Sequence, residues 1–180
     1  MSTDCTQQLA QQVCDTRACG DSLAICGAGS KPWRKNLTGA RLNMAEHSGV
    51  VAYDPSELVI VVRAGTTLLE LDRVLAEQGQ MLVAEPPSFA DASTVGGAIA
   101  LGWSGSRRPF GGALRDAVLG VRMINGLGEV LSFGGQVMKN VAGFDVARLM
   151  TGSLGHLGVI LEVSLRVVPK PPAEITVRLE

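Results

Sequence analysis

The sequence has 180 residues, of which 46% are hydrophobic and 18% charged, and this composition predicts a compact globular fold with a sizeable core. Sixteen basic and 17 acidic residues nearly cancel, and no basic run stands out, which argues against a nucleic-acid-binding function. No apolar run reaches the roughly 18 residues of a membrane span, and the first residues lack the pattern of a signal peptide. We therefore expect a cytoplasmic protein.

The numbers of glycine, aromatic and cysteine residues indicate the type of sheet and whether a metal site is present. The chain has 22 glycines, well above a typical share of about 7%, and only 4% aromatic residues. This bias predicts close approaches between backbone segments and a parallel or mixed sheet. Four cysteines, at positions 5, 14, 19 and 26, form no C-x-x-C pair, so reduced thiols are expected rather than a metal site.

The first elements lead to a glycine-rich corner. A helix is expected over residues 3–18 and a short strand over residues 23–26. Residues 27–32 follow, and their spacing fits neither a Walker loop nor a G-x-G-x-x-G motif. Bare amides, one hydroxyl and one lysine in a tight corner indicate an anion-binding nest made of Gly27, Ala28, Gly29, Ser30 and Lys31. Lys31 either contacts the anion or is solvated beside the loop.

Three short strands come next, over residues 41–45, 49–53 and 57–63. The last is rich in β-branched residues and is expected to be central in its sheet. A helix with apolar residues at helical spacing follows, with Thr66 as its expected N-cap. We take residues 1–80 as a first, small and β-rich lobe.

The most informative stretch lies in the middle of the chain, where a short helix is expected over residues 95–101. Ser93 and Thr94 are both candidates for its N-cap. Gly96 and Gly97 then fall in its first turn, at a cost of about 1 kcal/mol each relative to alanine. One explanation is that the bare first-turn amides bind an anion. The other is a glycine-rich turn packed tightly against a neighbouring strand, and the motif alone does not decide between them.

The rest of the chain alternates strands and short helices. We expect, in order, a loop over 106–112, strands over 117–125 and 129–133 joined by a hairpin turn, a helix over 145–150, a loop over 152–158, a strand over 159–168 and one more strand over 174–179. Residues 81–170 would form a second, larger α/β lobe. Residues 171–180 would be a linker or the start of a further C-terminal cap domain.

Eight short motifs occur along residues 20–170, each common alone but specific in this order. They are Cys26-Gly-Ala-Gly-Ser30, Val62-Arg-Ala-Gly65, Ser93-Thr-Val-Gly-Gly97, Arg108-Pro-Phe-Gly111, Asp116-Ala-Val-Leu-Gly120, Lys139-Asn-Val-Ala-Gly-Phe-Asp145, Thr151-Gly-Ser-Leu-Gly155 and Gly158-Val-Ile-Leu-Glu162. Together they resemble the FAD-binding domain (PCMH-type) of the vanillyl-alcohol oxidase and p-cresol methylhydroxylase flavoproteins. The resemblance implies an α+β, two-lobed fold with FAD between the lobes.

The resemblance also implies which residues hold the cofactor. The pyrophosphate would lie on two backbone nests, the first being residues 27–31. The second nest would be Thr94, Val95, Gly96 and Gly97. The path toward the flavin ring would be lined by Pro86, Gly102, Ser104 and Gly105. The adenine or ribose would be contacted by Gly158 and Val159.

Two departures from the family pattern bear on chemistry. Members that bind flavin covalently place a histidine or cysteine near the first nest or far downstream, and the nest itself has neither, so non-covalent FAD is implied. His47 and His156 are expected to be ordinary polar residues. Members that oxidise substrate unaided carry a cap domain with the catalytic base, so this chain alone is expected to lack the substrate site. No residue is assigned a catalytic role.

The stretch over residues 103–112 is similar to FAD-binding subunits of bacterial glycolate oxidases. This similarity implies an FAD-binding subunit or domain of a 2-hydroxy-acid (glycolate) oxidase or dehydrogenase complex. Its partners would be a catalytic flavoprotein and an iron–sulfur subunit, through which the protein could lie at the inner membrane. Two alternatives remain, a non-catalytic scaffold that keeps the fold, and an unrelated binder of nucleotide phosphates.

Four further side chains have an expected place. Arg107 and Arg108 either contact the diphosphate or a partner subunit, or face solvent. Asp116 is expected to cap a loop of the second lobe, and Asp145 likewise. Trp103 is expected to pack in the core rather than to act as a stacking platform.

Overall fold

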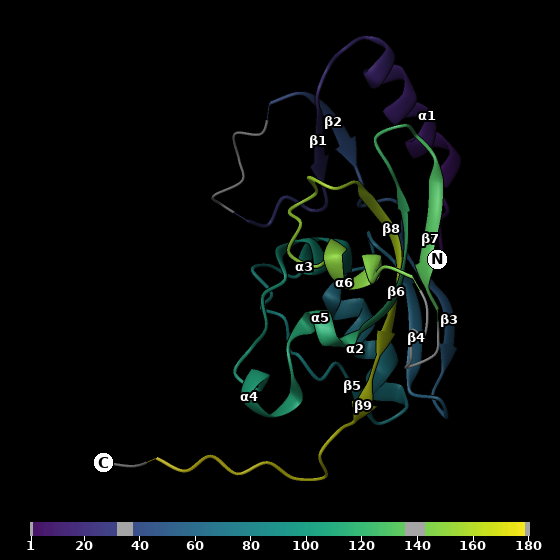
Figure 1. Ribbon diagram of the computed structural model, residues 1–180. Coiled ribbons are helices and arrows are strands. Elements are labelled where there is room, and N and C mark those ends of the chain that lie inside the picture. Colours follow the sequence, from purple (N-terminus) through teal and green to yellow (C-terminus); the bar gives the residue numbers. More distant parts are fainter. Residues whose placement is uncertain (1, 32–37, 136–142, 179–180) are drawn as a thin grey trace.

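The structure is a computed structural model that describes residues 2–31, 38–135 and 143–178. Its helices are α1 (Thr6–Ala18), α2 (Leu68–Glu77), α3 (Val95–Leu101), α4 (Arg108–Gly111), α5 (Leu114–Ala117) and α6 (Val146–Met150). Its strands are β1 (Leu23–Cys26), β2 (Ala40–Asn43), β3 (Val50–Asp54), β4 (Val59–Arg63), β5 (Gln80–Met81), β6 (Val118–Ile124), β7 (Val130–Gly134), β8 (Val159–Arg166) and β9 (Val168–Pro169). The fold is therefore α+β, as the sequence predicts (Figure 1).

A five-stranded sheet in the order β3-β4-β8-β6-β7 forms the middle of the molecule, and two-stranded sheets β1-β2 and β5-β9 flank it. All neighbours in the large sheet are antiparallel, and among the strands of the described residues the one parallel pair is β1 and β2. The expected parallel or mixed arrangement is therefore wrong for the large sheet. β4 is an interior strand, but β8 lies at the centre. Strands from both sides of residue 80 share this sheet.

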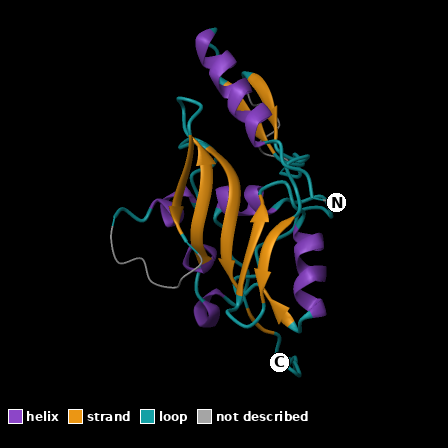
Figure 2. Cartoon of the chain, turned by 90° about the vertical axis from the view of Figure 1, so that its right-hand side faces the viewer, coloured by secondary structure: helices purple, strands orange, loops and turns teal. Residues whose placement is uncertain are grey.

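The large sheet has two chemically different faces. Along β8, Leu161, Val163 and Leu165 are fully buried, while the residues between them are half-buried. This period-two pattern places an apolar face against the helices and a polar face away from them. Helices α2, α3, α5 and α6 lie to one side of the strands in Figure 1, and Figure 2 views the sheet from its other face. The core consequently lies between the sheet and its helices.

Helix α2 begins one residue later than expected. Its N-cap is Thr67, whose side chain accepts a hydrogen bond from the Glu70 amide at 3.0 Å. The Thr66 hydroxyl is fully buried and instead accepts from the Gly49 amide at 2.9 Å, just before β3. Thr66 is thus unable to cap α2 because its oxygen is committed to another segment.

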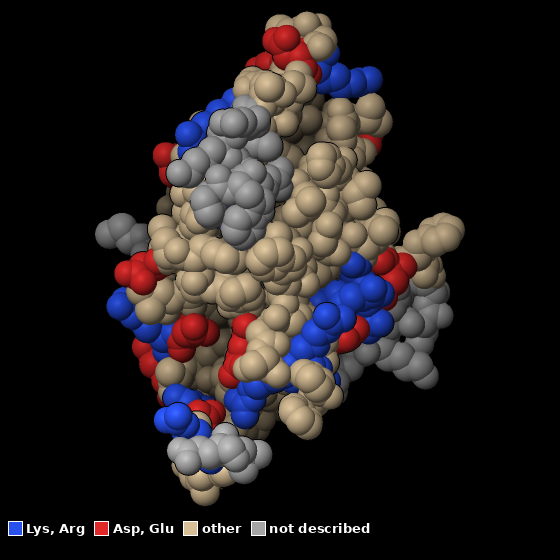
Figure 3. Space-filling view, turned by 90° about the vertical axis from the view of Figure 1, so that its left-hand side faces the viewer, with Lys and Arg blue, Asp and Glu red and all other residues tan. Residues whose placement is uncertain are grey.

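Two other expectations fail near the lower end of the molecule. Part of the expected loop at residues 106–112 forms the short helix α4, which has Pro109 in its first turn, where proline is tolerated. Residues 174–178 form no strand, and the last strand is β9, paired with β5. Arg107 instead holds this tail, with its guanidinium 3.7 Å from Glu174 and 3.4 Å from Glu85. Figure 3 shows charged side chains gathered toward this end of the face.

The N-terminal segment is anchored on His47. Its side chain is fully buried, and its Nδ1 accepts a hydrogen bond from the Cys5 amide at 3.0 Å. Thr3 and Ser48 also exchange two backbone hydrogen bonds, at 2.8 and 3.2 Å. Burial lowers the pKa of His47, although the nearby Asp4 carboxylate opposes this. A neutral imidazole is required because Nδ1 acts as an acceptor.

Helix α3 starts against the end of β4. The Val95 amide donates to the Thr66 carbonyl and the Gly96 amide to the Ala64 carbonyl, both at 2.8 Å. A Cβ on Gly96 would lie 2.6 Å from Ala64 Cβ and 3.0 Å from its carbonyl oxygen. For Gly96, tight packing against a neighbouring strand is the explanation that the structure bears out.

No helix within the described ranges is long and apolar enough to cross a membrane.

The two neighbouring glycines of α3 should respond differently to alanine. Gly96→Ala should lower the free energy of unfolding by about 1–3 kcal/mol, because the new methyl group would meet Ala64, whose backbone amide and carbonyl are both hydrogen-bonded directly after β4. Gly97→Ala should change it by less than about 1 kcal/mol, because its Cβ would meet only ends of side chains. Urea unfolding of both variants tests this, and equal losses would contradict the packing described for Gly96.

Stability should depend on pH through His47. Its pKa lies below the ordinary value of about 6.5, so the unfolded chain takes up the proton first as pH falls. The free energy of unfolding should thus be constant above about pH 7 and decrease below about pH 6.5. His47→Asn keeps an acceptor for the Cys5 amide and removes the titration, so its profile should be flatter between about pH 7 and 5. Parallel profiles for the two proteins, measured by urea melts, would refute the assignment.

Candidate functional site

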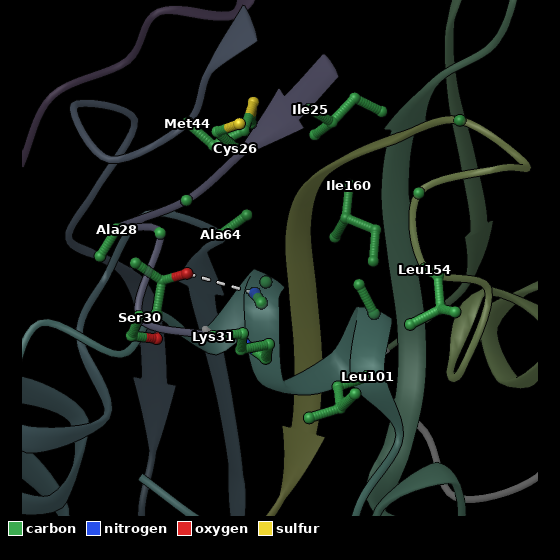
Figure 4. A pocket seen from close by; sticks show the side chains of 18 residues that line it. Ile25, Cys26, Ala28, Ser30, Lys31, Met44, Ala64, Leu101, Leu154 and Ile160 are labelled. Carbon is green, nitrogen blue, oxygen red and sulfur yellow. Dashed lines mark hydrogen bonds between the residues drawn. The ribbon is translucent and has the colours of Figure 1, made fainter. Parts of the chain in front are cut away.

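A pocket opens between the loop after β1, the start of α3 and the loop before β8 (Figure 4). The space between these segments is about 840 Å³ when the open mouth of the pocket is counted. The lining residues are Ile25, Cys26, Gly27, Ala28, Gly29, Ser30, Lys31, Met44, Ala64, Thr94, Gly96, Gly97, Ala100, Leu101, Leu154, Gly155, Gly158 and Ile160. Residues 27–31 and the start of α3, far apart in sequence, therefore share one cavity.

The loop after β1 offers bare backbone donors to this pocket. Within the described part of the chain, the amides of residues 27–30 donate no hydrogen bond to another protein group. Gly29 has a φ of +65°, a left-handed conformation that favours glycine. Ser93 fixes the loop by donating from its hydroxyl to Ser30 Oγ at 3.1 Å. The Ser93 contact thus fixes the loop in place, and its N–H groups remain available to bind an anion.

Thr94 joins this loop to helix α3. As the N-cap, its Oγ1 accepts from the Gly97 amide at 3.2 Å, the dashed line in Figure 4. A Cβ on Gly27 would lie 2.6 Å from that same oxygen, so the loop approaches the Thr94 side chain this closely only because residue 27 is glycine. A Cβ on Gly97 would lie 3.2 Å from Lys31 Nζ. The Lys31 ammonium therefore stands over the first turn of α3, inside the pocket.

The expected second set of open amides is absent from α3. Val95, Gly96 and Gly97 all donate within the protein, to Thr66, Ala64 and Thr94 respectively. The free first-turn amides inferred from the sequence are therefore wrong. Carbonyls just after β4 accept from Val95 and Gly96, and the Thr94 hydroxyl accepts from Gly97. Among the described residues that line the pocket, residues 27–30 offer a continuous run of amides with no acceptor within the protein.

Of the predicted site residues Pro86, Val95, Gly102, Gly158 and Val159, only Gly158 lines the pocket. Gly158 lines the pocket, whereas the side chains of Val95 and Val159 lie in the core at 1% and 3% exposure. Pro86 lines a separate groove beside α2. Gly102 is the left-handed C-cap of α3, with a φ of 73°.

Ser104 and Gly105 contact neighbouring segments of the protein outside the pocket. The Ser104 hydroxyl accepts from the Leu114 amide at 2.8 Å, at the start of α5. A Cβ on Gly105 would lie 2.4 Å from the Glu85 carbonyl oxygen, so this glycine permits a close backbone approach. Neither residue lines the pocket. Lys139, the first residue of one of the eight motifs, lies outside the described residues.

Sequence reasoning missed the apolar end of the pocket. Ile25, Cys26, Met44 and Ile160 gather there, at the top of Figure 4. Alternation could identify β1 and β8, but no local signal brings Met44 to the same cavity. Trp103, expected in the core, is 50% exposed instead.

The capping roles expected of two aspartates are present. Asp116 Oδ2 accepts from the Ala113 amide at 3.0 Å, and Asp145 is the N-cap of α6, accepting from the Arg148 amide at 3.1 Å. Both carboxylates thus stabilise helix starts in the second half of the chain.

Comparison with known proteins agrees with this architecture. Residues 3–134 match the family model described as FAD binding domain. Glycolate oxidase subunit GlcE of Escherichia coli (strain K12) is 47% identical over 178 residues, which are 98% of this chain and 51% of that protein. Glycolate oxidase subunit GlcD of Bacillus subtilis (strain 168) is 31% identical over 87% of this chain and 32% of its own length. D-lactate dehydrogenase of Anaerostipes hadrus is 31% identical over 77% of this chain and 29% of its own length.

The chain spans about half or less of the length of these relatives. Two structures of alkyldihydroxyacetonephosphate synthase share the fold, each with a TM-score of 0.73 over 93% of this chain and 31% of theirs. Their sequences are only 23% and 24% identical, so they show the fold alone. The family match extends over most of the present sequence. The chain therefore belongs to the family of FAD-binding domains.

Proposed function

We propose that FAD binds non-covalently in the pocket, with its pyrophosphate on the amides of residues 27–30. The observation that carries this proposal is the run of amides at residues 27–30, which have no acceptor within the described protein and line a glycine-rich pocket. The chain that holds this pocket belongs to a family of FAD-binding domains. A diphosphate needs several N–H donors and a nearby positive charge. The loop supplies the donors and Lys31 the charge.

The other walls suit the rest of the cofactor. Thr94 Oγ1 accepts from Gly97, so its hydroxyl proton is free to be donated to a phosphate oxygen. The apolar end at Ile25, Met44 and Ile160 suits a flat adenine. Two lining glycines, Gly27 and Gly97, leave space that any side chain would fill. These features support a dinucleotide lying along the pocket, with its adenosine toward β1.

The function that we propose is that of an FAD-binding subunit or domain of a 2-hydroxy-acid oxidase or dehydrogenase, with glycolate as the preferred candidate. The similarity to glycolate oxidase subunits and to a D-lactate dehydrogenase supports this, since glycolate and D-lactate are both 2-hydroxy acids. Bound flavin would supply the redox chemistry, while this chain binds and orients it. Substrate-contacting groups would come from a cap domain, and a catalytic flavoprotein and an iron–sulfur subunit would be the partners.

A scaffold that kept the fold but lost the cofactor is the alternative. Bulky residues at positions 27, 29, 96 or 97 would favour it, and all four are glycine. The pocket also remains open. The observations thus favour the binding function.

FAD titration of the purified protein tests the proposal. Wild type should bind FAD, and Gly97→Val should weaken binding at least about tenfold, because the valine methyls would enter the space beside Thr94 and Lys31. Gly126→Ala is the matched control, since a Cβ there meets nothing within 4 Å. Wild type that binds ATP but not FAD, or Gly97→Val that binds FAD normally, would contradict the assignment.

Thiol labelling locates the cofactor independently. Cys26 lines the pocket, whereas Cys14 and Cys19 are exposed elsewhere and serve as internal controls. FAD should slow alkylation of Cys26 several-fold and leave the two controls unchanged, as measured by peptide mass spectrometry. The intact mass should show no flavin adduct. Equal labelling of Cys26 with and without saturating FAD would place the cofactor elsewhere.

A further inference from the structure

The turn of residues 44–47 joins the wall of the pocket to the N-terminal segment. Met44 lines the pocket, and its amide donates to the carbonyl of Cys26, another lining residue, at 2.8 Å (Figure 4). Three residues later, the His47 amide donates back to the Met44 carbonyl at 3.1 Å. The turn therefore carries a pocket side chain at one end and the buried imidazole of His47 at the other.

The same turn is packed against Gly65, just after β4. The Gly65 amide donates to the His47 carbonyl at 2.8 Å, and a Cβ on Gly65 would lie 2.7 Å from that oxygen. The preceding residue, Ala64, also lines the pocket. Because backbone meets backbone at this distance, the position of Met44 in the pocket wall is tied to the position of His47.

Residues 2–5, which we call the latch segment, cover the His47 ring. The ring is fully buried, and its Nδ1 accepts a hydrogen bond from the Cys5 amide at 3.0 Å. Its Nε2 is buried and has no partner among the described residues. The side chains at positions 2–4 are exposed, so polar contacts more than apolar burial hold the latch segment. Such a segment can open locally while the rest of the protein stays folded.

Charged groups from the latch segment and from three strands surround the ring and oppose one another. Asp4 and Glu162 of β8 favour the protonated ring, whereas Arg63 of β4 and Arg122 of β6 disfavour it. Each arginine is paired with one of these carboxylates, Arg63 with Asp4 at 3.4 Å and Arg122 with Glu162 at 3.1 Å. Burial is the largest influence and lowers the pKa of His47, so the ring is neutral while the segment is closed. Burial also raises the pKa of the Cys5 thiol, which therefore carries no charge.

Protonation of His47 is incompatible with the closed segment. Because Nδ1 is an acceptor, the neutral ring carries its proton on Nε2, and a second proton can go only to Nδ1. There it would point at the Cys5 N–H, so that two donors would face each other. Asp4 Oδ1 does not replace the acceptor, because it lies 3.8 Å from Nδ1 and already accepts from the Thr6 amide at 2.9 Å. Opening of the latch segment removes the conflict, since it gives the charged ring access to water.

We propose that His47 makes residues 2–5 an acid-sensitive latch on the wall of the cofactor pocket. With a neutral ring, the segment is closed and supports the turn that positions Met44. With a protonated ring, the segment opens and the turn loses this support. Coupling between two sites is reciprocal, so a cofactor in the pocket should in turn favour the closed segment. The connection to FAD rests on the proposed function, whereas the response to acid does not.

The reactivity of Cys5 measures opening of the latch. This half-buried thiol belongs to the latch segment, whereas Cys14 and Cys19 are exposed. Maleimide labelling of the 180-residue protein, resolved by residue with mass spectrometry, gives the ratio of the Cys5 rate to the Cys19 rate, which cancels the common effect of pH on thiols. From about pH 7.5 to about pH 5.5 this ratio should rise up to about tenfold, because an open histidine with a pKa of about 6.5 takes up its proton in this range. Saturating FAD should lower the ratio several-fold at both pH values.

Two histidine variants make the test specific. His47→Asn keeps an acceptor for the Cys5 amide but takes up no proton, so its ratio should stay constant with pH. His156→Asn removes the other histidine of the sequence, which is exposed, and should respond to acid like wild type.

Each contrary outcome has a distinct meaning. A wild-type ratio that does not rise with acid, or one that rises equally in His47→Asn, would overturn the latch and leave the proposed function intact. FAD that binds without changing the ratio would overturn the connection between the latch and the pocket. Wild type that binds no FAD would overturn the proposed function, and the acid response of the two variants would still decide whether the latch exists.

Discussion

The site depends on the antiparallel pairing of residues 64–68 with residues 93–96. The amides of Val95 and Gly96 donate to carbonyls just after β4, and the Leu68 amide donates back to the Ser93 carbonyl at 2.8 Å. A β-bridge between Thr67 and Thr94 lies in the same segment. Three amides that would otherwise be unpaired at the starts of α2 and α3, those of Leu68, Val95 and Gly96, are satisfied in this way. The pairing therefore fixes both helices against the sheet before any ligand is considered.

Because of this pairing, the two glycine-rich stretches have different roles in the site. Helix α3 contributes shape, because Gly96 packs on Ala64 and Thr94 touches Gly27. The loop of residues 27–30 contributes hydrogen-bonding capacity, because its amides are not used within the described protein. The hydroxyl contact between Ser93 and Ser30 links the two stretches. An anion on the loop would thus lie on a support that is already held in place.

Sequence patterns predicted most elements but not the hydrogen-bonding state of the site. The bounds of α3 followed from its cap and its small apolar residues, and the strand expected over residues 159–168 is present as β8, which ends two residues earlier. Whether the α3 amides were open could not be predicted, because their acceptors lie about 30 residues earlier in the chain. The N-cap of α2 was missed for a similar reason, since a distant amide takes the Thr66 hydroxyl. Trp103 was misplaced because exposure of an aromatic residue beside a pocket has no local signal.

Amide hydrogen exchange, resolved by residue, tests the central claim most directly. Without cofactor, the amides of Val95 and Gly96 should be protected and those of Ala28, Gly29 and Ser30 should exchange quickly. Saturating FAD should protect the three loop amides and leave the two helix amides unchanged. Loop amides that exchange equally fast with and without bound FAD, together with altered exchange at Val95 and Gly96, would show that the diphosphate lies on α3 and contradict this account.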